Sequence, residues 1–114
     1  MQRFSLDLPM QRLDVYRVAR EFAVRVHHAR ISDAELRDQA TRASKSVFLH
    51  LCEGLPNEGV AMRRKYFVGA HNSLHEAVGA VDLAGAIGAV GAVQAVAIQQ
   101  LGVRLKALIR ALMR

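Results

Sequence analysis

The sequence has few of the residues that cross-link a chain or bind metal. It contains one cysteine, so it can form neither an intramolecular disulfide nor a metal site built from several thiolates. It also has two prolines, no tryptophan and 5% aromatic residues. Because aromatic residues are scarce while alanine, valine, leucine and arginine are abundant, the composition favours helices over sheets.

Neither intrinsic disorder nor a second domain fits the length and composition. The chain has 114 residues, of which 52% are hydrophobic and 23% are charged. These proportions are typical of a globular domain with a packed core, and the length is typical of one such domain. We therefore expect residues 1–114 to form a single domain.

Two features bear on the compartment of the protein. A single cysteine is typical of a reducing environment. The segment 1–9 includes Asp7 and lacks the apolar run of a signal peptide. We therefore expect a cytoplasmic protein.

No charged side chain occurs between Leu83 and Val103, a length that could cross a membrane. The segment contains four glycines and three glutamines, however, and these residues oppose insertion into a bilayer. Its centre, Gly88–Gly91, is typical of a break between two helices. We therefore expect no membrane-spanning segment and no membrane partner.

Apolar side chains recur at helical spacing in four segments. Pro9 suits the first turn of the first helix, because its missing N–H would have no partner there. Ser32–Glu35 matches a capping box with Ser32 as the N-cap, and Gly54 marks the end of the second helix. Four helices with short connections predict an all-α, up-down-up-down four-helix bundle. The predicted helices span about residues 9–30, 32–54, 60–87 and 92–113.

The third and fourth helices carry more apolar surface than one small bundle can bury. Small residues recur at four-residue spacing along the third helix, as at Ser73 and Ala77, and such a surface needs a closely packed neighbour. Both helices also lack charged side chains within residues 83–103, where a monomer needs a polar outer face. Exposed apolar patches typically mark subunit contacts. We therefore expect the chain to form a homo-oligomer.

Several short motifs follow one another in a characteristic order. They are Leu13–Ala19, Glu35–Val47, His50–Gly54, Ser73–Glu76 and Leu83-Ala84. In this order and spacing the chain resembles the small four-helix-bundle proteins encoded within intervening sequences of bacterial 23S ribosomal RNA genes. Those proteins are similar in fold to the accessory variability determinant proteins of diversity-generating retroelements. The resemblance implies a four-helix bundle, a ring-shaped homopentamer and no enzyme activity.

Two positions depart from the pattern of that family. His50 stands where the family usually has asparagine, and Cys52 stands where it usually has alanine. A role of that asparagine is therefore not carried over to this chain. The retroelement relatives act with nucleic acid and a reverse transcriptase, which makes nucleic acid an expected partner by analogy.

The histidines and the cysteine form no complete catalytic or metal-binding set. His71 and His75 have the spacing of two metal ligands, but the glutamate that follows the first histidine in zinc proteases is missing. The Glu-x-x-His pairs of di-iron bundles are also missing. Cys52 and His50 point apart on a helix and have no third partner. We expect no enzyme, no cofactor and no metal site.

Two glutamates, Glu53 and Glu76, occupy acidic positions that recur in the family. A half-buried carboxylate requires a nearby cation. The hairpin of the second and third helices would bring Glu76 near Arg42, and that of the third and fourth helices would bring it near Arg104. We predict a structural ion pair of Glu76 with one of these arginines. The predicted network comprises Glu53, Glu76, Arg42, Arg104, Ser46 and Ser73.

Basic residues outnumber acidic residues by 16 to 10, which gives a formal net charge of +6. They cluster at the start of the third helix and at the end of the fourth. An antiparallel hairpin brings these two places together, so we predict one basic rim that attracts phosphate groups. Tyr66 and Phe67 are the only adjacent aromatic residues, so contacts to phosphate and shape are favoured over base stacking. The candidate residues are Arg63, Arg64, Lys65, Arg104, Lys106, Arg110 and Arg114.

Two functions fit these features. The first is a non-enzymatic, oligomeric helical bundle that binds RNA or DNA, with structured RNA favoured, or a nucleoprotein partner through its basic surface. The second is a structural or protein-interaction module whose positive charge only maintains solubility. A contiguous positive patch favours the first function, whereas basic residues neutralised by acidic neighbours favour the second.

Overall fold

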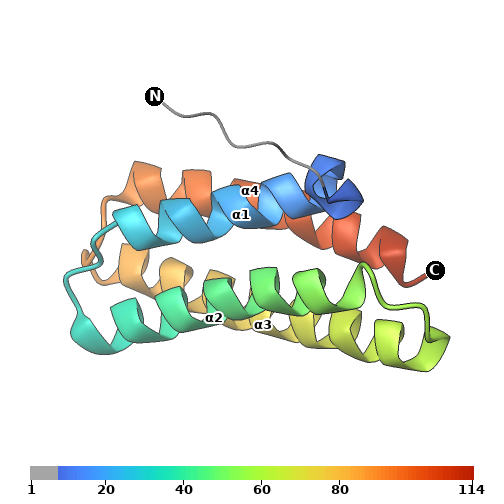
Figure 1. The fold of residues 1–114 in the computed structure, drawn as a ribbon. Helices are drawn as coiled ribbons and strands as arrows, with labels where there is room; N and C mark the ends of the chain where they lie inside the picture. The colour runs from blue at the N-terminus through green and yellow to red at the C-terminus, as the bar shows by residue number, and fades with distance from the viewer. Residues whose placement is uncertain (1–7) are drawn as a thin grey trace.

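A computed structural model describes residues 8–114 of the chain, and helices account for most of them (Figure 1). Within this part of the chain there are four α-helices and no strand, which confirms the all-α prediction. A short 3-10 helix, η1, precedes them. The elements are η1 (Pro9–Arg12), α1 (Asp14–His28), α2 (Ala34–Gly54), α3 (Val60–Ala86) and α4 (Ala92–Leu112).

The helices pack as neighbours around one core. α1 contacts α2 and α4, and α3 contacts the same two helices. The α1–α2 and α3–α4 connections meet at one end, where the backbone N–H and the hydroxyl of Ser32 both donate to the Ala89 carbonyl, at 2.9 and 3.1 Å. The α2–α3 connection lies at the same end of the molecule as the C-terminus (Figure 1).

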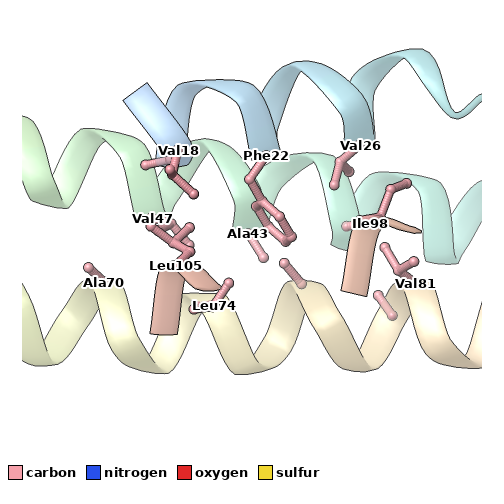
Figure 2. Packing of buried hydrophobic residues seen from close by; sticks show 14 of the residues in the cluster. Val18, Phe22, Val26, Ala43, Val47, Ala70, Leu74, Val81, Ile98 and Leu105 are labelled. Carbon is pink, nitrogen blue, oxygen red and sulfur yellow. The ribbon is translucent and has the colours of Figure 1, made fainter. Parts of the chain in front are cut away.

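The core is almost entirely aliphatic. Phe22 and Phe67 are its fully buried aromatic side chains. Figure 2 shows side chains from all four helices pointing into the shared space. Removal of each large apolar side chain from water stabilises the fold by about 1.5–3 kcal/mol. The labelled residues are Val18, Phe22, Val26, Ala43, Val47, Ala70, Leu74, Val81, Ile98 and Leu105.

Small residues let α3 approach both of its neighbours closely. Ala70, Ala77 and Ala84 are completely buried. A Cβ atom added to Gly54 would lie 2.8 Å from the Phe67 ring, and one added to Gly102 would lie 2.9 Å from a Val78 methyl group. The closely packed neighbours that the small residues require are therefore α2 and α4 of the same chain.

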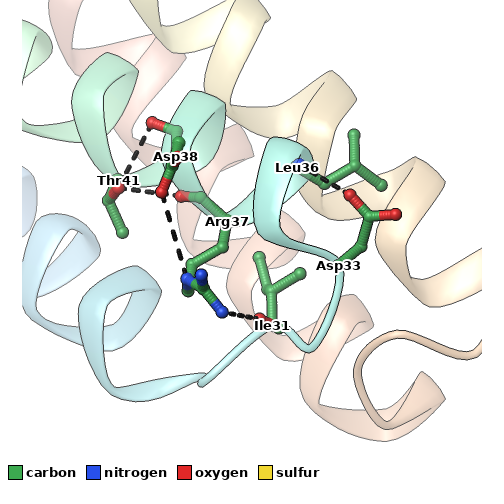
Figure 3. A network of polar contacts seen from close by, with 6 residues as sticks. All are labelled: Ile31, Asp33, Leu36, Arg37, Asp38 and Thr41. Carbon is green, nitrogen blue, oxygen red and sulfur yellow. Dashed lines mark hydrogen bonds and ion pairs between the residues drawn. The ribbon is translucent and has the colours of Figure 1, made fainter.

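Two predicted helix starts are wrong. Ser32 is not the N-cap of α2; Asp33 is, and its Oδ1 accepts the backbone N–H of Leu36 at 2.9 Å (Figure 3). The hydroxyl of Ser32 donates instead to the Ala89 carbonyl in the α3–α4 connection. A carboxylate is also the stronger hydrogen-bond acceptor for the N–H groups of a helix N-terminus. The first predicted helix is interrupted at Leu13, whose backbone is extended, so Pro9 begins η1 rather than α1.

The connection between α1 and α2 is held by side chains of the second helix. Arg30 adopts a left-handed conformation with φ 53° and turns the chain after α1. Arg37 then donates to the Ile31 carbonyl at 3.3 Å, and Thr41 donates to the Arg37 carbonyl at 2.8 Å (Figure 3). The Arg37 bond holds the start of α2 against the end of the turn, and the Thr41 bond lies within α2.

The close packing of α3 predicts a strong response to added volume at Ala77. Substitution Ala77→Leu should lower the free energy of unfolding by about 1–3 kcal/mol, because three further carbons have no space there. Ala61→Leu, at an exposed position of the same helix, is the matched control and should change stability by less than about 0.5 kcal/mol. Urea denaturation followed by circular dichroism measures both. Equal stability of the two variants would contradict the proposed packing.

Candidate functional site

The start of α3 and the end of α4 together form a basic cleft of about 450 Å³. Three of its five lining residues are arginines and none is acidic. Arg64 and His71 are seven positions apart, which places both on one side of α3. The α3–α4 cleft is lined by Arg64, His71, Arg110, Met113 and Arg114.

Arg64 joins the two helices that form the cleft. Its Nη1 donates to the Met113 carbonyl at 2.9 Å, although the two residues are 49 positions apart. This bond satisfies a carbonyl at the end of α4, where helices have unpaired acceptors. It uses one of the five N–H donors of a guanidinium group and holds that group at the cleft.

His71 lies among cations on both helices. Its ring centroid is 4.5 Å from that of His75 on the same helix. Burial lowers the pKa of His71, and the charges of His75, Lys106 and Arg110 lower it further. Its Nε2 atom is buried and has no hydrogen-bond partner. His71 is therefore neutral at pH 7 and carries one unsatisfied ring nitrogen.

The three consecutive basic residues of α3 have three different environments. Arg63 is half-buried: its Nη1 donates to the Leu55 carbonyl at 2.8 Å, and its guanidinium carbon lies 5.1 Å from the centre of the Phe67 ring. It holds the α2–α3 connection against α3. Lys65 is exposed and lies outside the α3–α4 cleft. Of the three, Arg64 alone lines the cleft.

The basic residues of α4 are also divided between two sides of the helix. Arg110 and Arg114 line the α3–α4 cleft. Lys106 lines the adjoining pocket one turn earlier. Arg104 is exposed and lies two residues before Lys106, which corresponds to about 200° around the helix. The structure therefore brings Arg64, Arg110 and Arg114 together in the cleft. It places Arg63 with Arg64 and Arg114 in a neighbouring pocket, and it leaves Arg104 apart.

The predicted ion pair of Glu76 with Arg42 or Arg104 is wrong. Glu76 is exposed and forms no ion pair with any residue of the described segment 8–114. Arg42 donates instead to Gln39 at 2.9 Å. The reason is the rotation of α3 about its axis, which places Glu76 on the outer side of the helix and turns Ala77 toward the core.

Glu53 interacts with a tyrosine rather than with a cation. Its charge raises the pKa of Tyr66. Glu53 also lines a groove of about 590 Å³ along α2, which contains side chains of both charges. The groove is lined by Asp38, Thr41, Arg42, Lys45, Ser46, Leu49, His50 and Glu53.

The two serines of the predicted network do meet, and His50 completes the cluster. The hydroxyl oxygens of Ser46 and Ser73 lie 2.9 Å apart. Nδ1 of His50 lies 2.7 Å from the Ser46 carbonyl oxygen and 3.0 Å from its hydroxyl. The His50 ring also rests on Gly69, where an added Cβ would be 2.7 Å from the ring. These contacts join α2 to α3 inside the chain.

The thiol of Cys52 is half-buried on α2. Burial raises the pKa of the Cys52 thiol, and the charge of Glu53 raises it further, so the thiol is protonated at neutral pH. Across residues 8–114, no three histidine, cysteine, aspartate or glutamate side chains lie close enough together to bind a metal ion.

Large apolar side chains are exposed on α4, at Leu83 of α3 and at Ile87 just after α3. Val93 is 86% exposed and Val103 is 69% exposed, and both lie in the segment without charges. We call these exposed side chains of residues 83–103 the apolar face. None of the described helices has the length and hydropathy needed to cross a membrane. The apolar face comprises Leu83, Ile87, Val93, Val96 and Val103.

His71 lines the cleft, but the pattern of lysines and arginines did not predict it. Its position two helical turns after Arg64 is the feature of the sequence that indicates it. Comparison with known proteins shows that residues 11–111 match the family described as 23S rRNA-intervening sequence protein. The match includes Arg64, His71 and Arg110. No curated protein matches the sequence.

The lowered pKa of His71 predicts a pH dependence of stability. As the pH falls below about 6.5, the unfolded chain binds a proton that native His71 resists, so the free energy of unfolding decreases. His71→Gln should therefore reduce this loss of stability between about pH 7.5 and pH 5.5. Urea denaturation at both pH values measures the difference, with His28→Gln on α1 as the exposed control. An unchanged loss in His71→Gln would contradict the assignment.

Proposed function

Because the chain belongs to the 23S rRNA-intervening sequence protein family, we propose that it binds structured RNA through the α3–α4 cleft without catalysing a reaction. The observation that carries this proposal is the convergence of Arg64, Arg110 and Arg114 in a cleft without acidic side chains. The family name refers to 23S rRNA, which favours RNA over other polyanions. The formal net charge of +6 acts in the same direction over longer distances.

The side chains around the cleft favour contacts to phosphate over contacts to bases. Arginine binds phosphate through two parallel N–H bonds, which gives both strength and orientation. A stacking platform for bases requires exposed aromatic rings. Phe67 is buried, and Tyr66 interacts with Glu53. The proposed recognition therefore depends on the spacing of phosphates in a folded RNA.

We further propose that the protein acts as a ring-shaped homo-oligomer, a pentamer by family resemblance, of up-down-up-down bundles. The apolar face supports this proposal, because one chain leaves Val93 and Val103 largely in water. A ring would repeat the α3–α4 cleft once per subunit. Several weak phosphate contacts on one RNA would then combine into tight binding.

The α2 groove favours a second candidate function, that of a protein-interaction module. Its charged side chains have both signs, and Leu49 beside them is 59% exposed. This combination suits a protein surface with complementary charges better than it suits a polyanion. In this case the positive charge of the cleft only maintains solubility.

RNA binding by the purified protein should depend strongly on salt. If an oligomer contacts about six phosphates, its affinity for a structured RNA should fall about a thousandfold between about 50 and 200 mM salt. Fluorescence anisotropy with a labelled RNA hairpin measures this change, and duplex DNA of equal length serves as the comparison. Absence of binding at low salt would contradict the RNA proposal and favour the protein-interaction module.

The proposed assembly predicts that a charge on the apolar face separates the subunits. Val103→Glu should lower the solution mass measured by light scattering, because an interface cannot bury an unpaired carboxylate without a large penalty. The matched control is Val24→Glu on α1, an exposed valine outside the apolar face. Both variants should keep the helical circular dichroism spectrum. The interface is assigned wrongly if Val103→Glu retains the wild-type mass.

A further inference from the structure

The α3–α4 cleft has the composition of a site for one small anion. Guanidinium groups from two helices converge on it, and no acidic side chain lines it. Its volume of about 450 Å³ exceeds that of a phosphate group, so the cleft can also hold several ordered waters. Arg64 is held by its bond to Met113, which reduces the entropy lost when a ligand binds.

The end of α4 opposes an anion unless its carbonyl groups are covered. Helix C-termini carry a partial negative charge, which repels phosphate. Arg64 donates to the Met113 carbonyl and so covers one of these acceptors. Arg110 lies on the last turn of α4, and Arg114 follows two residues after the end of that helix. The positive charge of the cleft therefore exceeds the partial negative charge of the helix end.

His71 is the group in the cleft whose charge can change near neutral pH. The groups that face it are all basic: His75 on α3, and Lys106 and Arg110 on α4. Arg64 and Arg114 line the same cleft. Its Nε2 atom has no hydrogen-bond partner. An anion in the cleft would offset the repulsion from these cations and so favour protonation of the His71 ring.

We infer that the cleft is a binding site for a single tetrahedral oxyanion, such as a phosphate group, bound by Arg64, Arg110 and Arg114, beside a His71 ring that takes up a proton when the anion binds. This inference deepens the proposed function and rests on it for the identity of the phosphate as part of an RNA. The ion itself can also be free phosphate or sulfate, since all share the same oxygen geometry. Binding of the anion then takes up a proton, so acidification strengthens it.

Sulfate is the probe of choice because its charge does not change over the relevant pH range, whereas that of inorganic phosphate does. Titration of the wild-type protein with sodium sulfate, followed by NMR of the His71 ring and the arginine side chains, should show about tenfold tighter binding at about pH 5.5 than at pH 8. Sodium chloride at equal ionic strength corrects for screening.

Two variants test separately the contributions of Arg110 and His71 to anion binding. Arg110→Gln, at an exposed position, should weaken sulfate binding at both pH values. His71→Gln should keep the affinity at the higher pH and lose the gain on acidification. The matched controls are Arg17→Gln and His28→Gln, which are exposed on α1. The inference is overturned if Arg17→Gln weakens binding as much as Arg110→Gln, or if His71→Gln retains the full gain.

RNA binding by the same variants distinguishes an error in the anion site from an error in the proposed RNA function. Arg110→Gln should weaken binding to the RNA hairpin about tenfold and flatten its salt dependence, while Arg17→Gln should change both less. Sulfate binding without RNA binding would overturn the RNA function and leave the anion site standing. Equal RNA binding by Arg110→Gln and wild type would overturn the cleft as the RNA contact and would leave RNA binding to another surface of the protein.

Discussion

The close contact between α2 and α3 is the constraint on which the rest of the structure depends. Gly54 lies against Phe67, Gly69 lies against His50, and Ala77 is completely buried. Larger side chains at these positions would separate the two helices and open space along their whole length. The pair forms a platform, and α1 and α4 complete the core against it.

This platform determines which surfaces remain open. α4 buries Ile98 and Leu105 against the other helices, while Val93 and Val103 stay in water on its outer side. Because the start of α3 meets the end of α4, the arginines of the two helices share one cleft. The apolar face and the α3–α4 cleft thus follow from the same arrangement of two helices.

Both surfaces cost stability in the isolated chain. Exposed valines forgo burial, and cations crowded into one cleft repel each other. The structure reduces the second cost by keeping His71 neutral and by binding Arg64 to a backbone carbonyl. Residues that lower the stability of a fold are typically found at its binding surfaces. A second copy of the chain would relieve the first cost, and an anion would relieve the second.

Local patterns in the sequence were sufficient for the helices and insufficient for individual polar contacts. The spacing of apolar residues and the breaks at Gly54 and Gly88–Gly91 predicted α3 and α4 to within one residue at each end. The prediction of Ser32 as the N-cap of α2 was wrong. Its hydroxyl donates to the carbonyl of Ala89, which lies 57 residues away and so cannot be read from a local pattern. The prediction of an ion pair for Glu76 was also wrong. Residue spacing alone does not show how a helix is rotated relative to its neighbour.

The sequence by itself determined the four helices, the aliphatic core and membership of the family, since each depends on periodicity or on motif order within the chain. Only the tertiary structure decided which basic residues act together. Arg63, Arg64 and Arg104 are alike in sequence, yet one binds a loop carbonyl, one lines the cleft and one faces away. The reason is that each side chain follows the rotation of its helix, and that rotation is set by packing against distant residues.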